Sequence, residues 1–189
     1  FVPQIDPKPS KLQKSWLPGP TANSRFTPAE MAMINPPPAS SASSEPRAPR
    51  KVDGMDAALA KFAAGWKIRD CGDAMDPGLR TEWGGHSNVL VVHPISKSKP
   101  CILSREYKVP ESGAAALYIT ARDDERGDWV LVVTANGKEL TRQTIGQDAW
   151  QTFSLDLSPF AGQTLNLDIQ NVANDWRYEA AYFSSIEIK

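Results

Sequence analysis

The prolines of this chain are concentrated at one end, and this limits what that end can fold into. Eleven of the sixteen prolines lie in residues 1–50, which contain only one of the twelve glycines, Gly19. Proline fixes φ and removes a backbone donor, so the segment favours extended, polyproline-like chain. The stretch Ala39–Arg50 is rich in Ser and Ala and has the composition of a linker. We therefore predict an extended arm and linker over residues 1–50.

The arm carries apolar side chains that are spread along the chain. Polyproline-like chain has no internal hydrogen bonds, so its order must come from burying such side chains on another surface. Fifty extended residues also reach far beyond one small domain. We expect the arm to dock on a neighbouring protein subunit, and the alternative is that it folds back on its own domain. The expected anchors are Phe1, Ile5, Trp16, Phe26, Met31 and Ile34.

The charge balance argues against nucleic acid as a partner. The 189 residues carry a formal net charge of −1, whereas phosphate binding needs a basic face. No run of about 18 apolar residues occurs in the sequence, so we predict no membrane span. The sequence begins at Phe1 and has no signal-peptide core, as expected of a processed or trimmed N-terminus.

Residues 51–65 predict one short amphipathic helix. Asp53 is the expected N-cap, Met55, Leu59 and Phe62 share one face, and Gly65 ends the helix.

Residues 66–189 predict an all-β domain. Leu165, Leu167 and Ile169 alternate with polar residues, which is typical of a half-buried antiparallel strand. Asn136-Gly137 between two apolar runs predicts a tight hairpin. Regular strands without helices between them indicate an antiparallel β-sandwich or barrel. The expected strands are Trp66–Asp70, Asn88–His93, Cys101–Val109, Ala114–Ala121, Trp129–Ala135, Lys138–Ile145, Trp150–Leu157, Thr164–Asn171 and Glu179–Ile188.

Three stretches of this region resemble a known family. They are WVLVVTANGKEL, WQTFSLDLSPFAGQTLNLDIQN and NDWRYEAAYFSSIEI. Together they are similar to the galactose-binding-like jelly-roll domains, the fold of many carbohydrate-binding modules on secreted bacterial proteins. The similarity covers about residues 66–189 and implies a secreted or cell-surface location. This fold serves glycan binding, protein docking and plain structural roles, so it does not decide the function.

The sequence contains no recognisable catalytic motif. It has no GxSxG, HExxH, P-loop, GxGxxG or CxxC, so we predict that the protein is not an enzyme. The only two histidines, His86 and His93, could join Asp73 or Asp76 in a metal site, but we interpret them as ordinary polar residues. We predict no cofactor. A structural calcium ion stays open, because the fold often carries one and the loop Arg122–Trp129 is rich in carboxylates.

Cys71 and Cys101 are the only cysteines. An even count and the family resemblance favour one disulfide in a secreted protein, closing a loop of about thirty residues. The alternative is a pair of buried thiols, each behaving as a small apolar side chain.

Two tryptophan-bearing loops are the best candidates for a ligand site. The apolar face of a sugar stacks on an exposed ring, and neighbouring polar side chains bind its hydroxyls. We expect Trp83 to be exposed, and Trp66, Trp129 and Trp150 to belong to the core. The candidate glycan-binding residues are Trp83, Arg80, His86, Trp176, Asp175 and Arg177.

Two functional interpretations follow. The first is a non-enzymatic structural subunit of an extracellular or surface assembly, whose arm docks on a partner chain. The alternative is a carbohydrate-binding module that recognises glycan through its tryptophan loops.

Overall fold

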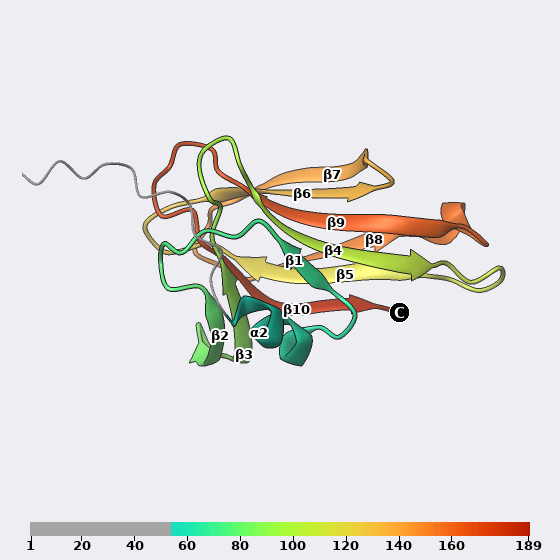
Figure 1. Cartoon of the computed structure of the whole chain (residues 1–189), viewed down its shortest axis with the longest axis horizontal. Coiled ribbons are helices and arrows are strands. Elements are labelled where there is room, and N and C mark those ends of the chain that lie inside the picture. Colours follow the sequence, from blue (N-terminus) through green and yellow to red (C-terminus); the bar gives the residue numbers. More distant parts are fainter. Residues whose placement is uncertain (1–53) are drawn as a thin grey trace, which may run out of the picture. The chain divides into compact units, whose positions relative to one another are not determined.

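The computed structural model describes residues 54–189, and these form the β-sandwich domain (Figure 1). The contacts of the chain divide it into residues 1–46 and residues 47–189, and every described residue belongs to the second unit. The predictions about the arm, its six anchors and the Asp53 cap therefore lie outside the described residues. No helix among residues 54–189 has the length and apolar character needed to cross a membrane.

The predicted helix is present as α2, Met55–Phe62. Its N-cap is Gly54, whose φ of +88° lies in the left-handed region that glycine tolerates, and no side chain caps the helix. Met55 and Leu59 are buried in the main core, and Phe62 packs against it. The helix contacts β1, β2 and β3, so it belongs to the sandwich domain and is not a separate linker.

Ten strands follow, and the nine expected ones are all present with ends within two residues of the predicted ones. The additional strand, β2, was missed because it contains no fully buried residue and so lacks an alternating pattern. A short 3-10 helix, η1 (Ser158–Phe160), precedes β9. The strands are β1 Lys67–Arg69, β2 Gly78–Trp83, β3 His86–Val92, β4 Cys101–Lys108, β5 Ala116–Arg122, β6 Trp129–Ala135, β7 Lys138–Ile145, β8 Gln151–Asp156, β9 Thr164–Val172 and β10 Ala181–Ile188.

The strands form two five-stranded antiparallel sheets that face each other across one core (Figure 1). The first sheet has the order β1-β4-β9-β6-β7, and the second has the order β2-β3-β10-β5-β8. Leu165, Leu167 and Ile169 of β9 are fully buried between the sheets, which confirms the period-two prediction. Trp129 and Phe183 meet edge-to-face in this core, with ring centroids 5.6 Å apart.

The hairpin between β6 and β7 is the one that the sequence predicts. Asn136 and Gly137 have φ values of +51° and +78°, and Ala135 pairs with Lys138 across the turn. Left-handed φ at both central residues matches the right-handed twist of the two strands.

The expected Cys71–Cys101 disulfide is not formed in this structure, which holds both residues as buried free thiols. The two side chains are nevertheless close enough for each thiol to shift the pKa of the other, and the Cys71 thiol donates to the backbone carbonyls of Gly72 and His93 at 3.6 Å. The neighbouring Cys101 lowers the pKa of Cys71, whereas burial raises the pKa of Cys101. The sequence therefore predicted the proximity of the two residues, and the bond between them stays a prediction.

Candidate functional site

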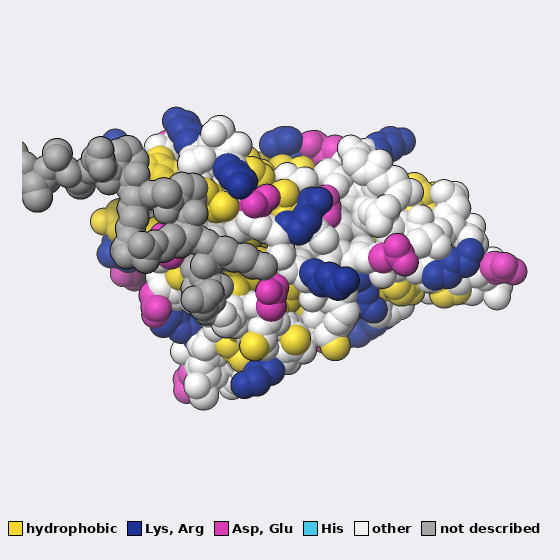
Figure 2. Space-filling model, in the orientation of Figure 1, with side chains coloured by type: hydrophobic (Ala, Val, Ile, Leu, Met, Phe, Trp, Pro, Cys, Tyr) yellow, Lys and Arg dark blue, Asp and Glu magenta, His cyan; other side chains and the backbone are white. Residues whose placement is uncertain are grey.

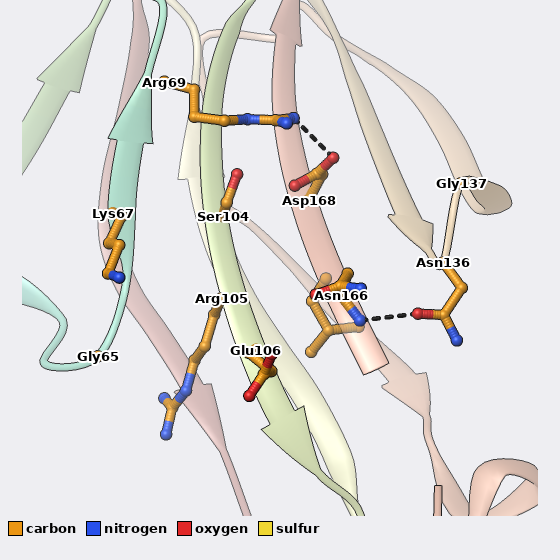
Figure 3. Close-up of a pocket in the computed structure, with 11 residues that line it drawn as sticks. Gly65, Lys67, Arg69, Ser104, Arg105, Glu106, Asn136, Gly137, Asn166 and Asp168 are labelled. Atoms are coloured by element: carbon orange, nitrogen blue, oxygen red, sulfur yellow. Dashed lines mark hydrogen bonds and ion pairs between the residues drawn. The ribbon is translucent and has the colours of Figure 1, made fainter. Parts of the chain in front are cut away.

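A shallow hollow of about 880 Å³ lies on the solvent face of the first sheet, and we call it the trough. Arg69 of β1 reaches across β4 to Asp168 of β9, with 2.9 Å between guanidinium and carboxylate (Figure 3). At the β6–β7 turn, the Asn136 side-chain oxygen accepts a hydrogen bond from the Asn166 backbone N–H at 2.8 Å. The lining residues are Gly65, Lys67, Arg69, Ser104, Arg105, Glu106, Asn136, Gly137, Asn166, Leu167 and Asp168.

Apart from Leu167 and two glycines, the trough is lined by polar and charged residues, and none of the described residues that line it is aromatic. Figure 2 shows Lys and Arg side chains over the middle of this face, with hydrophobic side chains only as scattered patches. Hydroxyl, amide and charged groups can bind sugar hydroxyls, but the trough offers no ring on which a sugar could stack.

A second hollow, of about 420 Å³, lies at one end of the sandwich between three loops. These are the β5–β6 loop (123–128), the β7–β8 loop (146–150) and the β9–β10 loop (173–180), which we together call the loop end. Its lining contains five carboxylates and two guanidinium groups. The lining residues are Asp123, Glu125, Arg126, Gly127, Asp128, Gly146, Gln147, Asp148, Asp175 and Arg177.

The β9–β10 loop presents two exposed aromatic side chains beside this cavity. Trp176 and Tyr178 are each 44% exposed, and they are the exposed large hydrophobic side chains of residues 54–189. Asp175 and Arg177, which alternate with them, line the cavity. Both aromatic residues have positive φ, +74° and +53°, so the loop needs support from elsewhere to hold this conformation.

That support is the buried carboxylate of Glu179. It accepts backbone N–H groups from Asn174, Asp175, Trp176 and Arg177 at 2.7–3.2 Å. Its residue is only 1% exposed. Burial raises the pKa of this carboxyl, and the four N–H donors act in the opposite direction. The loop is thus folded around one carboxyl group.

The β5–β6 and β9–β10 loops are packed directly on each other. A β-carbon at Gly127 would lie 2.2 Å from the carbonyl oxygen of Arg177, so only glycine allows this approach. The Arg126 guanidinium lies 4.2 Å from the centre of the Tyr178 ring and forms an ion pair with Asp124 at 2.8 Å. The hydrogen bond from Arg126 lowers the pKa of Asp124. These contacts fix Tyr178 relative to the cavity.

The network continues from Asp124 to the second tryptophan loop. The Tyr182 hydroxyl donates to Asp124 at 3.3 Å, and burial together with this carboxylate raises the pKa of Tyr182 to about 12. Trp83 stacks on Tyr182 with ring centroids 3.7 Å apart, and it meets Trp150 edge-on at 5.9 Å. The two predicted tryptophan loops are therefore connected through shared contacts, although they do not form one site.

Trp83 is half-buried, which corrects the prediction that it is substantially exposed. The hairpin between β2 and β3 folds over the outer face of the second sheet, where Trp83 covers Tyr182. Trp150 is also corrected, because it packs in this small outer cluster and donates its indole N–H to Gly84 at 2.8 Å. Trp66 and Trp129 lie in the main core as predicted.

The remaining sequence candidates have structural contacts of their own. Arg80 forms an ion pair with Asp76 at 2.8 Å, and His86 lies beside Trp150 with ring centroids 4.5 Å apart. His93 is buried against Pro94 and meets Trp176 edge-on at 5.4 Å. Within residues 54–189, no group of three or more His, Cys, Asp or Glu side chains is arranged to hold a metal ion.

Sequence reasoning missed several residues of the loop end. Tyr178 and Arg126 were not candidates, and Glu179 was interpreted only as the start of a strand. The available signal was a single Glu directly before the apolar run AAYF, since a carboxylate in such a position needs hydrogen-bond donors if it is buried.

The comparisons with known proteins concern the fold. No protein-family model and no curated protein matches the chain. The chain is similar to the CBM22-1 xylan-binding domain from Paenibacillus barcinonensis, at 13% identity over 68% of this chain and 86% of that one, with a TM-score of 0.47. A family 35 carbohydrate-binding module from Clostridium thermocellum is 14% identical over 65% of this chain and 90% of that one, with a TM-score of 0.45.

A third similar structure is the cleaved adhesin domain of Lys-gingipain from Porphyromonas gingivalis. It is 14% identical over 68% of this chain and 92% of that one, with a TM-score of 0.49. The antiparallel β-sandwich expected from the sequence is shown by the two sheets themselves, and carbohydrate-binding modules are among the structures that resemble it. No site residue is carried over at this level of identity.

The stacking of Trp83 on Tyr182 leads to a prediction about stability. Trp83→Ala removes a half-buried ring from a packed cluster, so it should lower the free energy of unfolding by about 2 kcal/mol. Trp176→Ala removes an exposed ring and should change it by less than about 0.5 kcal/mol. Urea denaturation of both variants measures the difference, and equal effects would contradict the assigned packing.

The burial of Glu179 leads to a prediction about pH. Its folded-state pKa is raised, so the stability that this group contributes is greatest below its ordinary pKa and falls as the pH rises through the raised value. The free energy of unfolding of the parent, relative to Glu179→Gln, should therefore decrease from pH 4 towards pH 7. Denaturation curves at several pH values test this. A difference that increases with pH would mean that the four N–H donors outweigh burial.

Proposed function

We propose that this domain is a glycan-binding module without catalytic activity and that it binds glycan at the loop end. The observation that carries the proposal is the pair of exposed rings, Trp176 and Tyr178, on a loop whose Asp175 and Arg177 line a polar cavity. Aromatic rings supply the apolar surface for a sugar ring, and carboxylates and guanidinium groups bind its hydroxyls.

The same geometry favours the loop end over the trough. The trough is larger, and neither described lining contains an aromatic side chain, but at the loop end the exposed rings of Trp176 and Tyr178 alternate along the chain with the lining residues Asp175 and Arg177. At the loop end, rings and hydroxyl-binding groups lie on the same loop. Of the six predicted glycan-binding residues, Trp176, Asp175 and Arg177 belong to the proposed site. Trp83, Arg80 and His86 support the neighbouring cluster.

The glycan-binding interpretation also replaces the structural subunit as the preferred one. Docking on a partner subunit rests on residues 1–50, which lie outside the described part of the chain. Glycan binding rests on side chains whose contacts are described. Attachment of the arm to another subunit is compatible with it and stays a separate expectation.

Removing the rings tests the proposal directly. In a glycan-array screen and subsequent titration of the full chain, Trp176→Ala and Tyr178→Ala should each weaken binding about tenfold or more, which corresponds to about 1.4 kcal/mol. Tyr118→Ala is the matched control, because Tyr118 is a partly exposed ring on β5, close to the C-terminal Lys189 and outside the loop end.

The control should bind glycan as the parent does, and circular dichroism should show all three variants folded. Binding that survives both loop-end substitutions, or that is lost equally in Tyr118→Ala, would exclude the loop end as the site.

We further propose an extracytoplasmic location, in which Cys71 and Cys101 become bonded. The two buried thiols are already close enough to shift each other's pKa, and a disulfide would close a loop of about thirty residues, worth about 3 kcal/mol. Protein from an oxidising compartment should yield the linked peptide in a non-reducing digest and should lose thermal stability on reduction. Cys71→Ser should melt at the same temperature with and without reductant. Free thiols in protein isolated from its native compartment would contradict the proposal.

A further inference from the structure

The cavity at the loop end has an excess of negative charge. Its lining holds Asp123, Glu125, Asp128, Asp148 and Asp175, against only Arg126 and Arg177. Both arginines form ion pairs with carboxylates, Arg126 with Asp124 and Arg177 with Asp175. Asp148 is paired with Arg122, which approaches from the second sheet.

Three of the lining carboxylates form no ion pair among the described residues. These are Asp123, Glu125 and Asp128, all from the β5–β6 loop. Arg126, which is paired with Asp124, also attracts Glu125, and the described lining still holds more carboxylates than guanidinium groups.

Asp123 is the residue that distinguishes this cavity from an ordinary acidic surface. It is only 2% exposed, yet it lines the cavity. Its Oδ2 accepts the backbone N–H of Asp148 at 3.2 Å, whereas its Oδ1 is buried without a hydrogen-bond partner among the described residues. A buried carboxylate oxygen without a hydrogen-bond donor lowers the stability of the folded domain. A group that donated a hydrogen bond at this position would remove that cost.

We propose that the loop-end cavity takes a cationic sugar, that is, a glycan residue with a free amino group. An ammonium group has three donors and no acceptor, which suits a cavity whose lining includes the carboxylates of Asp123, Glu125 and Asp128. The Arg126 guanidinium already lies over the Tyr178 ring, so Trp176, which is 44% exposed, is the loop-end ring that can take a further cation over its face. A volume of about 420 Å³ accommodates a sugar ring, which is far larger than a bare ion.

This inference rests on the proposed glycan-binding function and narrows its ligand class. The probes are three oligosaccharides of equal length: the fully deacetylated glucosamine tetramer, its N-acetylated form and a neutral glucose tetramer. In titrations of the full chain at low salt, the deacetylated tetramer should bind at least tenfold more tightly than the other two. Its affinity should fall as salt is added, because the attraction is partly between charges.

Asp123→Asn tests the named residue, and it should reduce affinity for the deacetylated tetramer at least tenfold with little effect on neutral sugars. Glu125→Gln is the second variant, because Glu125 is exposed and its substitution leaves folding intact even if Asp123→Asn does not fold. Glu111→Gln is the matched control, an exposed carboxylate on the β4–β5 connection at the opposite end of the strands.

The outcomes separate the two proposals. If none of the three tetramers binds and the glycan array also yields no ligand, the glycan-binding function itself is wrong; if the array yields a ligand but the deacetylated tetramer does not bind, only the cationic ligand class is wrong. If the three tetramers bind equally, or if Asp123→Asn and Glu125→Gln bind the deacetylated tetramer like the parent, the loop end binds glycan but the cationic ligand class is wrong. Calorimetry with calcium chloride alone is the last arm. Calcium binding that Asp123→Asn abolishes would show that the site serves a metal ion and would overturn the inference.

Discussion

The conformation of the loop end depends on the hydrogen bonds that one buried carboxyl group, that of Glu179, accepts. Glu179 lies where β10 begins, next to residues that must be buried, so its carboxyl leaves water as the sheet forms. The donors come from the backbone of the preceding loop, which must curl back over the carboxyl in a conformation with two positive φ values. Asn171 of β9 fixes the other side by donating to the Glu179 backbone carbonyl at 2.9 Å. The display of Trp176 and Tyr178 is therefore a consequence of satisfying buried polar groups.

The β-sandwich could be predicted from the sequence because its strands and turns are specified by residues that are close together in the chain. Leu165, Leu167 and Ile169 repeat with the period of a strand, and Asn136-Gly137 specifies a turn whose geometry glycine and asparagine tolerate. The strand β2 could not be found in this way, because an edge strand without a buried face has no periodicity to detect. The predicted exposure of Trp83 was wrong for a related reason. The β2–β3 hairpin that carries Trp83 folds over its own sheet, and nothing in the local sequence indicates such a bend.

The candidate site was less predictable because it is assembled from segments that are distant in the sequence. Asp123 belongs to one loop, while the backbone N–H that it accepts belongs to Asp148, 25 positions away. Tyr182 reaches Asp124 across 58 positions. Trp176, Asp175 and Arg177 could be chosen as candidates from the sequence, because the binding chemistry of each side chain follows from its residue type alone. Which carboxylates would converge, and which arginines would already be occupied, depends on pairing that only the folded structure contains.

The two polar surfaces of the domain each hold one buried oxygen without a hydrogen-bond partner among the described residues, and they differ in the charge of that group. In the trough the oxygen belongs to the neutral Ser104 hydroxyl, and Arg69 and Asp168 tie β1 to β9 across β4, so part of the charge of the trough stabilises the sheet that carries it. At the loop end, arginines and carboxylates are also paired, yet the oxygen without a described donor belongs to a carboxylate, that of Asp123. A folded chain tolerates such a defect at a cost in stability, and that cost is recovered when a ligand supplies the missing donor. The gain in free energy on binding is larger when the loops that carry the site are already rigid. The carboxyl of Glu179 and the close contact at Gly127 hold the loops in place before any ligand arrives, so little further ordering of the backbone has to accompany binding.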